Sequence, residues 1–245
     1  MPTLTVSSDY TVADQLRMAK ATRYFAWQSA LAKAALGRRV LEIGCGLGNF
    51  TAQLGDRELV IGLDVDAACI AHHQERFAGQ SRIGAQLLDI ATLDAGSPAL
   101  LELRARRPDS IACLNVLEHI DDHLTALRRM HDVLPAGGHV VLIVPAFMAL
   151  YGPIDRNLGH YRRYTRASVR ALAEQAGFAV AQLRYMNTIG FFGWWMNARL
   201  LKRTAQSEGQ IALFDRWLVP IMAAVEGLVP PPFGQSLFVV LERLK

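Results

Sequence analysis

The feature that most constrains the fold is a buried-strand pattern that runs into a turn with three glycines. Residues 38–50 read Arg-Arg-Val-Leu-Glu-Ile-Gly-Cys-Gly-Leu-Gly-Asn-Phe. The apolar run at 40–43 is typical of a parallel strand covered on both faces. Gly44, Gly46 and Gly48 let the backbone turn sharply beneath a ligand. The pattern predicts a strand, a glycine turn and a helix, with a nucleotide-like ligand at the turn.

The spacing of the glycines discriminates between cofactors. A dinucleotide fingerprint needs glycine at its first, third and sixth positions, and the sixth position here is Asn49. NAD, and with it an oxidoreductase, is therefore disfavoured. A second apolar strand at 59–63 ends in Asp64, an acid placed to bind ribose hydroxyls.

Strand and helix patterns alternate through the chain. Strands are predicted at 39–43, 59–64, 83–88, 110–114, 139–145, 178–186 and 236–244, and helices at 11–36 and 165–176. This alternation predicts an α/β, Rossmann-like, doubly wound sheet of seven strands in a single domain over 1–245, with right-handed crossovers. The domain divides into an N-terminal helical segment (1–37), a core (38–186), a helical cap (187–235) and a last strand (236–245).

Four motifs in register resemble the class I S-adenosylmethionine (SAM)-dependent methyltransferases. They are Glu-x-Gly-x-Gly-x-Gly with Asp64, Leu-Leu-Asp-Ile at 87–90, and the segments 109–120 and 134–145. The resemblance implies SAM as cofactor, S-adenosylhomocysteine as product and an antiparallel last strand. It also implies cofactor contacts from Glu42, Gly44, Cys45, Gly46, Gly48, Asp64, Val65, Asp89, Ile90, Asn115 and Val116.

Two of these residues have assigned places in the resembling family, and each has an alternative. Glu42 lies there under the methionine moiety, and a buried carboxylate at this position needs a ligand ammonium or other donors. Asp89 looks like the contact to the adenine amine, but an Asp before an apolar residue often caps a helix. Cys45 is expected to pack in the turn.

A basic stretch at 155–166 follows the fifth strand. It reads Asp-Arg-Asn-Leu-Gly-His-Tyr-Arg-Arg-Tyr-Thr-Arg and resembles a loop of a bacterial methyltransferase branch found among glycan- and lipid-modifying enzymes. Arginine forks bind carboxylates and phosphates, so Tyr161, Arg162, Arg163 and Tyr164 are predicted to contact an anionic group of the acceptor. The alternative is a solvated basic loop.

Methyl transfer from a sulfonium needs mainly placement, plus a base for hydroxyl acceptors. Candidate catalytic residues are His119, His160 and Asp155, although His119 could instead cap or pack a helix start. No metal is expected. The neighbouring acids and histidine at 121–123 are interpreted as helix-start residues.

The connection at 187–235 is rich in aromatic residues and is predicted to form a helical cap over the active site. Trp194 and Trp195 are candidate substrate contacts. The same aromatic residues could instead lie on a membrane surface or pack the cap onto the sheet.

Composition limits the partners and the location. The net charge of +4 comes from dispersed basic residues, so no nucleic-acid partner is expected. The three cysteines are widely spaced and no secretory pattern is present, so a cytoplasmic protein is predicted. It is not expected to span a membrane, because no uncharged stretch reaches ~18 residues, but peripheral contact with the inner face of the membrane is an option. The oligomeric state stays open.

The resulting expectation is a SAM-dependent methyltransferase acting on a partly apolar small-molecule or lipid-linked acceptor with an anionic or polar group. O-methylation is the first choice. Transfer to carbon of a prenyl-type or enol-like substrate, transfer to nitrogen, and a non-catalytic SAM- or lipid-binding scaffold at a membrane surface are the alternatives.

Overall fold

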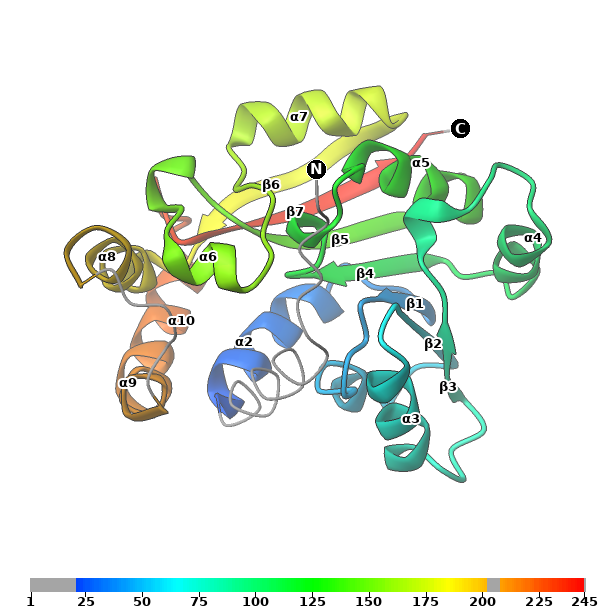
Figure 1. Cartoon of the computed structure of the whole chain (residues 1–245), viewed down its shortest axis with the longest axis horizontal. Coiled ribbons are helices and arrows are strands. Elements are labelled where there is room, and N and C mark those ends of the chain that lie inside the picture. The colour runs from blue at the N-terminus through cyan, green and yellow to red at the C-terminus, as the bar shows by residue number, and fades with distance from the viewer. Residues whose placement is uncertain (1–20, 202–207, 245) are drawn as a thin grey trace.

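The computed structural model describes residues 21–201 and 208–244, and in these ranges one seven-stranded sheet organises the chain (Figure 1). Its strand order is β3-β2-β1-β4-β5-β7-β6. The strands are β1 (Arg39–Ile43), β2 (Leu59–Asp64), β3 (Ile83–Leu87), β4 (Ser110–Leu114), β5 (His139–Pro145), β6 (Phe178–Met186) and β7 (Ser236–Arg243).

The strand directions confirm the predicted topology. β1 pairs in parallel with both β2 and β4, whereas β7 is antiparallel to β5 and to β6. The chain moves outward from β1 to β3, and then returns to place β4 on the other side of β1. Ligands of doubly wound sheets bind at such a switch point, beyond the carboxyl ends of the strands.

Helices cover both faces of the sheet (Figure 1). The α-helices are α2 (Thr22–Lys33), α3 (Ala67–Arg76), α4 (Pro98–Ala105), α5 (His123–Val133), α6 (Pro153–Asn157), α7 (Arg166–Gln175), α8 (Thr188–Met196), α9 (Glu208–Leu213) and α10 (Val219–Leu228). Short 3₁₀ helices are η1 (Thr51–Leu54), η2 (Ile90–Thr92), η3 (Leu117–His119) and η4 (Met148–Leu150), and π-helical turns are η5 (Asn197–Leu201) and η6 (Phe214–Leu218).

Two apolar cores follow from the alternation of side chains along the strands. Leu41 and Ile43 of β1 join the core under α4, α5 and α7, whereas Val40 joins the core with α2 and α10. Successive side chains of a strand point to opposite faces, so a strand that is apolar throughout must be covered twice. The core strands are therefore held rigidly.

Most predicted boundaries agree with the structure to within a residue, and two differ. The N-terminal helix was predicted over 11–36. The described helix is α2, which ends at Lys33 and so three residues before the predicted end, and 11–20 lie outside the described residues. The helix expected directly after the glycine turn is a short 3₁₀ helix, the four-residue η1, which ends before Gly55. The Thr51 hydroxyl of η1 instead donates to Glu42.

The described parts of the segment 187–235 are mostly helical, with helices at 188–201 and 208–228, and two buried acids anchor it. The Asp215 carboxylate accepts the backbone N–H groups of Arg23 and Tyr24 at 3.2 and 2.8 Å, so it caps α2 from a distant part of the chain. The Glu226 carboxylate accepts the N–H groups of Asn187 and Thr188 at 2.9 and 2.8 Å at the start of α8. Unpaired N–H groups at helix starts explain both positions.

Candidate active site

The glycine turn is fixed by hydrogen bonds between the ends of β1 and β2. The N–H groups of Gly44 and Cys45 donate to the Leu63 carbonyl at 2.8 and 3.0 Å, and the Gly46 N–H donates to Asp64 Oδ2 at 2.8 Å. Gly44, Gly46 and Gly48 all have positive φ values, of 71°, 50° and 76°. These residues must be glycine because other residues rarely adopt this region.

Side chains close around the turn. A Cβ atom at Gly44 would clash with Val116, and one at Gly48 would clash with Phe77. Cys45 is buried and lies against Gly62 of β2, so it packs as expected. The first glycine is therefore in contact with the loop that follows β4, where the chemistry is expected.

Asp64 is held in a fixed orientation at the end of β2. Its Oδ1 accepts the Asp66 N–H at 3.0 Å while Oδ2 accepts from Gly46. Burial raises the pKa of Asp64 against the lowering effect of these hydrogen bonds. A ribose-binding role for Asp64 fits this placement, and Val65 beside it is exposed.

Glu42 begins a buried polar chain beneath the turn. Thr51 Oγ1 donates to Glu42 Oε2 at 2.6 Å and lies 3.1 Å from His73 Nε2. Burial raises the pKa of Glu42 to about 8, with the Thr51 hydrogen bond opposing the shift. Thr51 and His73 were missed by the sequence interpretation, because only the fold brings α3 and η1 to the end of β1.

The remaining predicted cofactor residues lie at the ends of β3 and β4. Asp89 Oδ1 accepts the Ala91 N–H at 2.9 Å, so Asp89 caps η2, which was the alternative considered for it. Ile90 is buried in the core. Asn115 has a positive φ of 56° and directs the chain from β4 towards Val116. Their contacts to a cofactor stay predictions.

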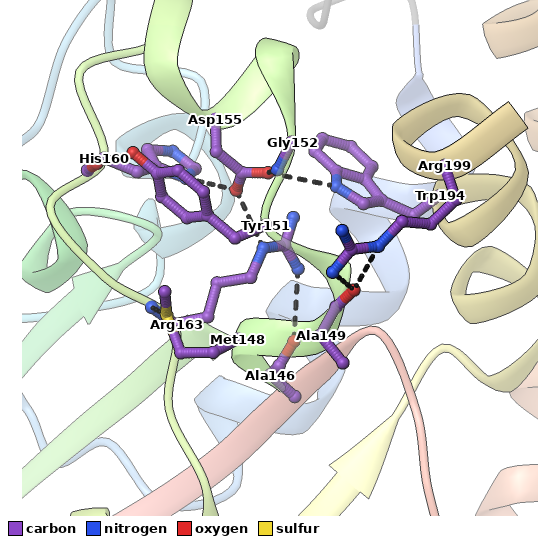
Figure 2. A network of polar contacts seen from close by, with 10 residues as sticks. All are labelled: Ala146, Met148, Ala149, Tyr151, Gly152, Asp155, His160, Arg163, Trp194 and Arg199. Atoms are coloured by element: carbon purple, nitrogen blue, oxygen red, sulfur yellow. Dashed lines mark hydrogen bonds and ion pairs between the residues drawn. The ribbon is translucent and has the colours of Figure 1, made fainter. Parts of the chain in front are cut away.

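Asp155 is the centre of a buried network in the loop after β5 (Figure 2). Its Oδ1 accepts from His160 Nδ1 at 2.9 Å and from Arg163 Nε at 2.8 Å, and its Oδ2 accepts from the Gly152 N–H at 2.9 Å and from Trp194 Nε1 at 3.3 Å. Burial acts to raise the pKa of Asp155, but the hydrogen bonds and charges of His160 and Arg163 outweigh it and lower the pKa. Because both oxygens are occupied, Asp155 suits positioning better than proton abstraction.

Two histidines meet beside this network. The rings of His119 and His160 lie 4.6 Å apart in an edge-to-face arrangement, although 41 positions separate them. Desolvation by the surrounding protein lowers the pKa of His119, and the nearby His160 lowers it further. His119 is therefore neutral near pH 7, although the residue is exposed. Glu118, which the sequence interpretation did not single out, lies next to the pair and is buried. The structure thus brings together both histidines that the sequence proposed.

The predicted substrate residues of the loop differ in accessibility. Arg163 is buried, and besides Asp155 it contacts the Ala146 carbonyl and the ring of Trp194. Tyr164 is buried near Leu117, whereas Tyr161 is exposed. Arg162 donates to the Ile120 carbonyl at 2.8 Å. Anion binding by this group stays a prediction, and of the four residues Tyr161 has the most accessible side chain.

In the cap, Trp194 faces the Asp155 network whereas Trp195 is 44% exposed.

At the start of α5, Asp122 Oδ1 accepts the Thr125 N–H at 3.0 Å, which confirms the helix-start interpretation of Asp122. Among the described residues, no helix is long and apolar enough to cross a bilayer.

The strand order, the glycine turn and the acid after β2 together define a class I, Rossmann-like methyltransferase fold. A family model described as a methyltransferase domain matches residues 14–183. The chain therefore belongs to the methyltransferase-domain family.

Known proteins agree with this assignment. A probable S-adenosylmethionine-dependent methyltransferase of Mycolicibacterium smegmatis is 32% identical over 165 residues, covering 66% of this chain and 58% of the relative. A ubiquinone biosynthesis O-methyltransferase of Ralstonia nicotianae is 27% identical over 171 residues, covering 60% and 66%. The chain thus spans less than two thirds of the length of these two curated relatives.

The fold is also similar to that of a solved complex between the Haloferax volcanii Trm112 methyltransferase activator and a putative methyltransferase. The TM-score is 0.65 at 17% identity, covering 97% of this chain and 96% of the other. The family match and the relatives support S-adenosylmethionine as the cofactor of this chain.

Proposed function

We propose that this chain transfers the methyl group of S-adenosylmethionine to a hydroxyl group of a partly apolar, lipid-like small molecule. The observation that carries the proposal is the His119–His160 pair, in which His119 follows β4 and His160 lies in the loop after β5. β4 pairs with β1, the strand that leads into the glycine turn. The sulfonium already activates the methyl group, so the site must align the acceptor and handle its proton. The two imidazoles of His119 and His160 would handle the proton of the acceptor.

The relatives favour oxygen as the acceptor atom. The Ralstonia nicotianae protein, which is 27% identical to this chain, is named as an O-methyltransferase. Transfer to carbon needs no different fold, so the acceptor atom is decided by experiment.

An exposed apolar surface on the cap supports a lipid-like acceptor. We call it the apolar face, and it consists of two helical stripes with exposed side chains. Within each stripe most neighbouring members are three or four positions apart, so they lie on one face of the helix. The members are Phe192, Trp195, Met196 and Leu200 in the first stripe, and Leu213, Trp217, Ile221, Val225 and Leu228 in the second.

Charge on the cap favours contact of the apolar face with an anionic bilayer surface. The acids Asp215 and Glu226 are buried as helix caps, whereas Arg199 and Arg216 are exposed. Apolar side chains with exposed cations suit the interface of an anionic membrane. The proposed acceptor would then reach the site from the membrane surface.

Methyl transfer can be tested with radiolabelled S-adenosylmethionine and two defined acceptors, a long-chain phenol and a long-chain hydroxy acid. We expect label in the organic phase as a methyl ether or ester, and a large loss with His119→Gln. Label bound to carbon would support the alternative acceptor atom. No transfer to either hydroxyl compound, by protein that binds the cofactor, would count against the proposal.

Membrane contact can be tested by flotation with vesicles containing about 30% anionic lipid. We expect the chain to float, and the Trp195→Ala, Trp217→Ala double variant to remain in the soluble fraction. Leu101→Ala on α4 is the control, because Leu101 is similarly exposed at 54% outside the apolar face. Unchanged flotation of the double variant would reject the docking surface, and a concentration-dependent dimer lost in that variant would assign the face to a second copy.

A further inference from the structure

Glu118, His119 and His160 form a cluster of potential metal ligands, of which the proposed function uses only the two histidines. One ligand atom from each residue lies within 4.8 Å of the other two. Glu118 is 1% exposed, and its Oε2 has no hydrogen-bond partner within the part of the chain that the structure describes. A buried carboxylate oxygen without a donor costs free energy, so something must compensate it.

His160 has one ring nitrogen engaged, which leaves the other for the cluster. His160 Nδ1 donates to Asp155 Oδ1 at 2.9 Å, so His160 Nε2 carries the lone pair. Histidines that bind metals almost always donate their second N–H to a carboxylate or a backbone carbonyl in this way. The Asp155 network in Figure 2 therefore has the form of the support around a metal site.

We propose that Glu118, His119 and His160 bind one divalent transition-metal ion. Two neutral imidazoles and one carboxylate make a ligand set that suits Zn²⁺, Fe²⁺, Co²⁺ or Mn²⁺ and leaves coordination positions open. If all three pairs of atoms stood at the 4.8 Å limit, a central ion would lie about 2.8 Å from each, so each ligand would move by roughly 0.7 Å to reach ~2.1 Å. Side-chain rotation provides such a shift.

The local charges favour a cation. Arg163, the buried guanidinium nearby, is bound to Asp155 and to the Ala146 carbonyl, and no hydrogen bond between it and Glu118 is present among the described residues. The Asp155–Arg163 pair is neutral as a unit, so the Glu118 carboxyl group has no counterion bonded to it among the described residues. The backbone also fixes the cluster, since the Tyr161 N–H donates to the Glu118 carbonyl at 2.9 Å.

The proposed catalytic consequence rests on the proposed function. With the ion bound, the two imidazoles would be ligands and not the base. An acceptor hydroxyl at an open position of the ion would have its pKa lowered and lose its proton to solvent. The oxygen lone pair would then form the O–C bond to the methyl group as the C–S bond breaks, with that electron pair remaining on sulfur. The products are the methylated acceptor, S-adenosylhomocysteine and one proton. No metal was expected from the sequence, where the acids and histidine at 121–123 were considered instead.

Cobalt titration of the chelator-stripped full chain tests the site without any methyl transfer. We expect one Co²⁺ per chain, seen as absorption between about 500 and 650 nm, and at least about tenfold weaker binding in Glu118→Gln, His119→Gln and His160→Gln. The controls are His72→Gln, which removes an exposed histidine on α3, and Asp121→Asn, which removes an exposed acid near the cluster. Both should bind like the wild type.

The outcomes separate this inference from the proposed function. Absence of saturable 1:1 binding to the wild type, a result that needs no variant to fold, would overturn the metal site, as would unchanged binding in folded His119→Gln. Calorimetry with S-adenosylmethionine should give the wild-type affinity for Glu118→Gln. Cobalt binding without methyl transfer would leave the metal site standing and reject only its catalytic consequence.

Discussion

The two halves of the site are built by different means. The glycine turn, where we expect the cofactor, is shaped by its backbone. It has three positive φ values and N–H groups that bond to the neighbouring strand. The loop after β5, where we propose the acceptor binds, is shaped by one buried carboxylate that accepts from three donors of its own loop and from Trp194 of the cap. The first half needs particular residues at fixed local spacing, and the second needs particular partners in space.

This difference explains how one family can keep a cofactor and change acceptors. A backbone turn tolerates no side chain at its glycines, whereas a side-chain network can be rebuilt around another substrate. Variants in the two halves should therefore fail in different ways: those in the turn should lose ligand affinity, and those in the Asp155 network should lose stability.

The largest expected effect is on stability, in Asp155→Ala. Removing the carboxylate leaves the buried Arg163 uncompensated, which should cost about 3–5 kcal/mol and lower the melting temperature by roughly 6–15 °C. Thermal unfolding measured by circular dichroism checks this. The control Asp121→Ala removes an exposed ion pair with Arg162 and should change stability by less than about 0.5 kcal/mol. Equal losses in both variants would contradict a structural role for the network.

Gly46→Val should weaken cofactor binding at the glycine turn. Valine is strained at a φ of 50° and would intrude where the cofactor approaches the backbone, so S-adenosylmethionine affinity should fall by about 100-fold or more. Calorimetry measures the affinity. Gly55→Val is the matched control, because Gly55 follows η1 with a φ of −62° and open space around it. Wild-type affinity in Gly46→Val would mean that the ligand does not lie on this turn.

Glu42→Gln should change the pH dependence of cofactor binding. With the pKa of Glu42 raised to about 8, the carboxyl is mostly protonated at pH 6, whereas a cationic methionine moiety favours the ionised form. Affinity of the wild type should therefore rise on the order of tenfold from pH 6.0 to 7.5, while the Gln variant stays nearly flat. A parallel rise in both proteins would remove Glu42 from the cofactor site.

The raised pKa of Glu42 also predicts how the stability of the protein without cofactor depends on pH. Because the folded pKa lies above the unfolded value, the stability that Glu42 contributes is present below pH 4.5 and is lost as pH rises towards 8. The melting temperature of Glu42→Gln relative to the wild type should therefore be higher at pH 8 than at pH 5.

The smallest expected effect tests how the helical cap at 187–235 is joined to the core. Asp215→Ala removes the carboxylate that accepts the first N–H groups of α2, which should cost about 1 kcal/mol. Hydrogen exchange should accelerate in the first turn of α2 and leave β1 unchanged. Unaltered exchange at Arg23 and Tyr24 would show that this contact does not hold α2 to the cap.

The sequence by itself determined the sheet, its seven strands and the glycine turn. These features rest on local patterns: apolar runs covered on both faces, glycines where φ must be positive, and an acid ending the next strand. Strand limits were predicted to within a residue, and the candidate histidines were found because imidazole is suited to proton transfer. Helix length after the turn was not predicted, since η1 depends on the contact between Thr51 and Glu42.

Only the tertiary structure decided what the side chains of the acceptor half do. Asp155, a candidate base in the sequence, is occupied by four donors, and Arg163, a candidate anion contact, is one of them. Glu118 became a candidate ligand because the loop after β5 brings His160 to the end of β4. Local spacing encodes backbone geometry, whereas the hydrogen-bond partners of a buried charge depend on how its loop and the cap fold around it.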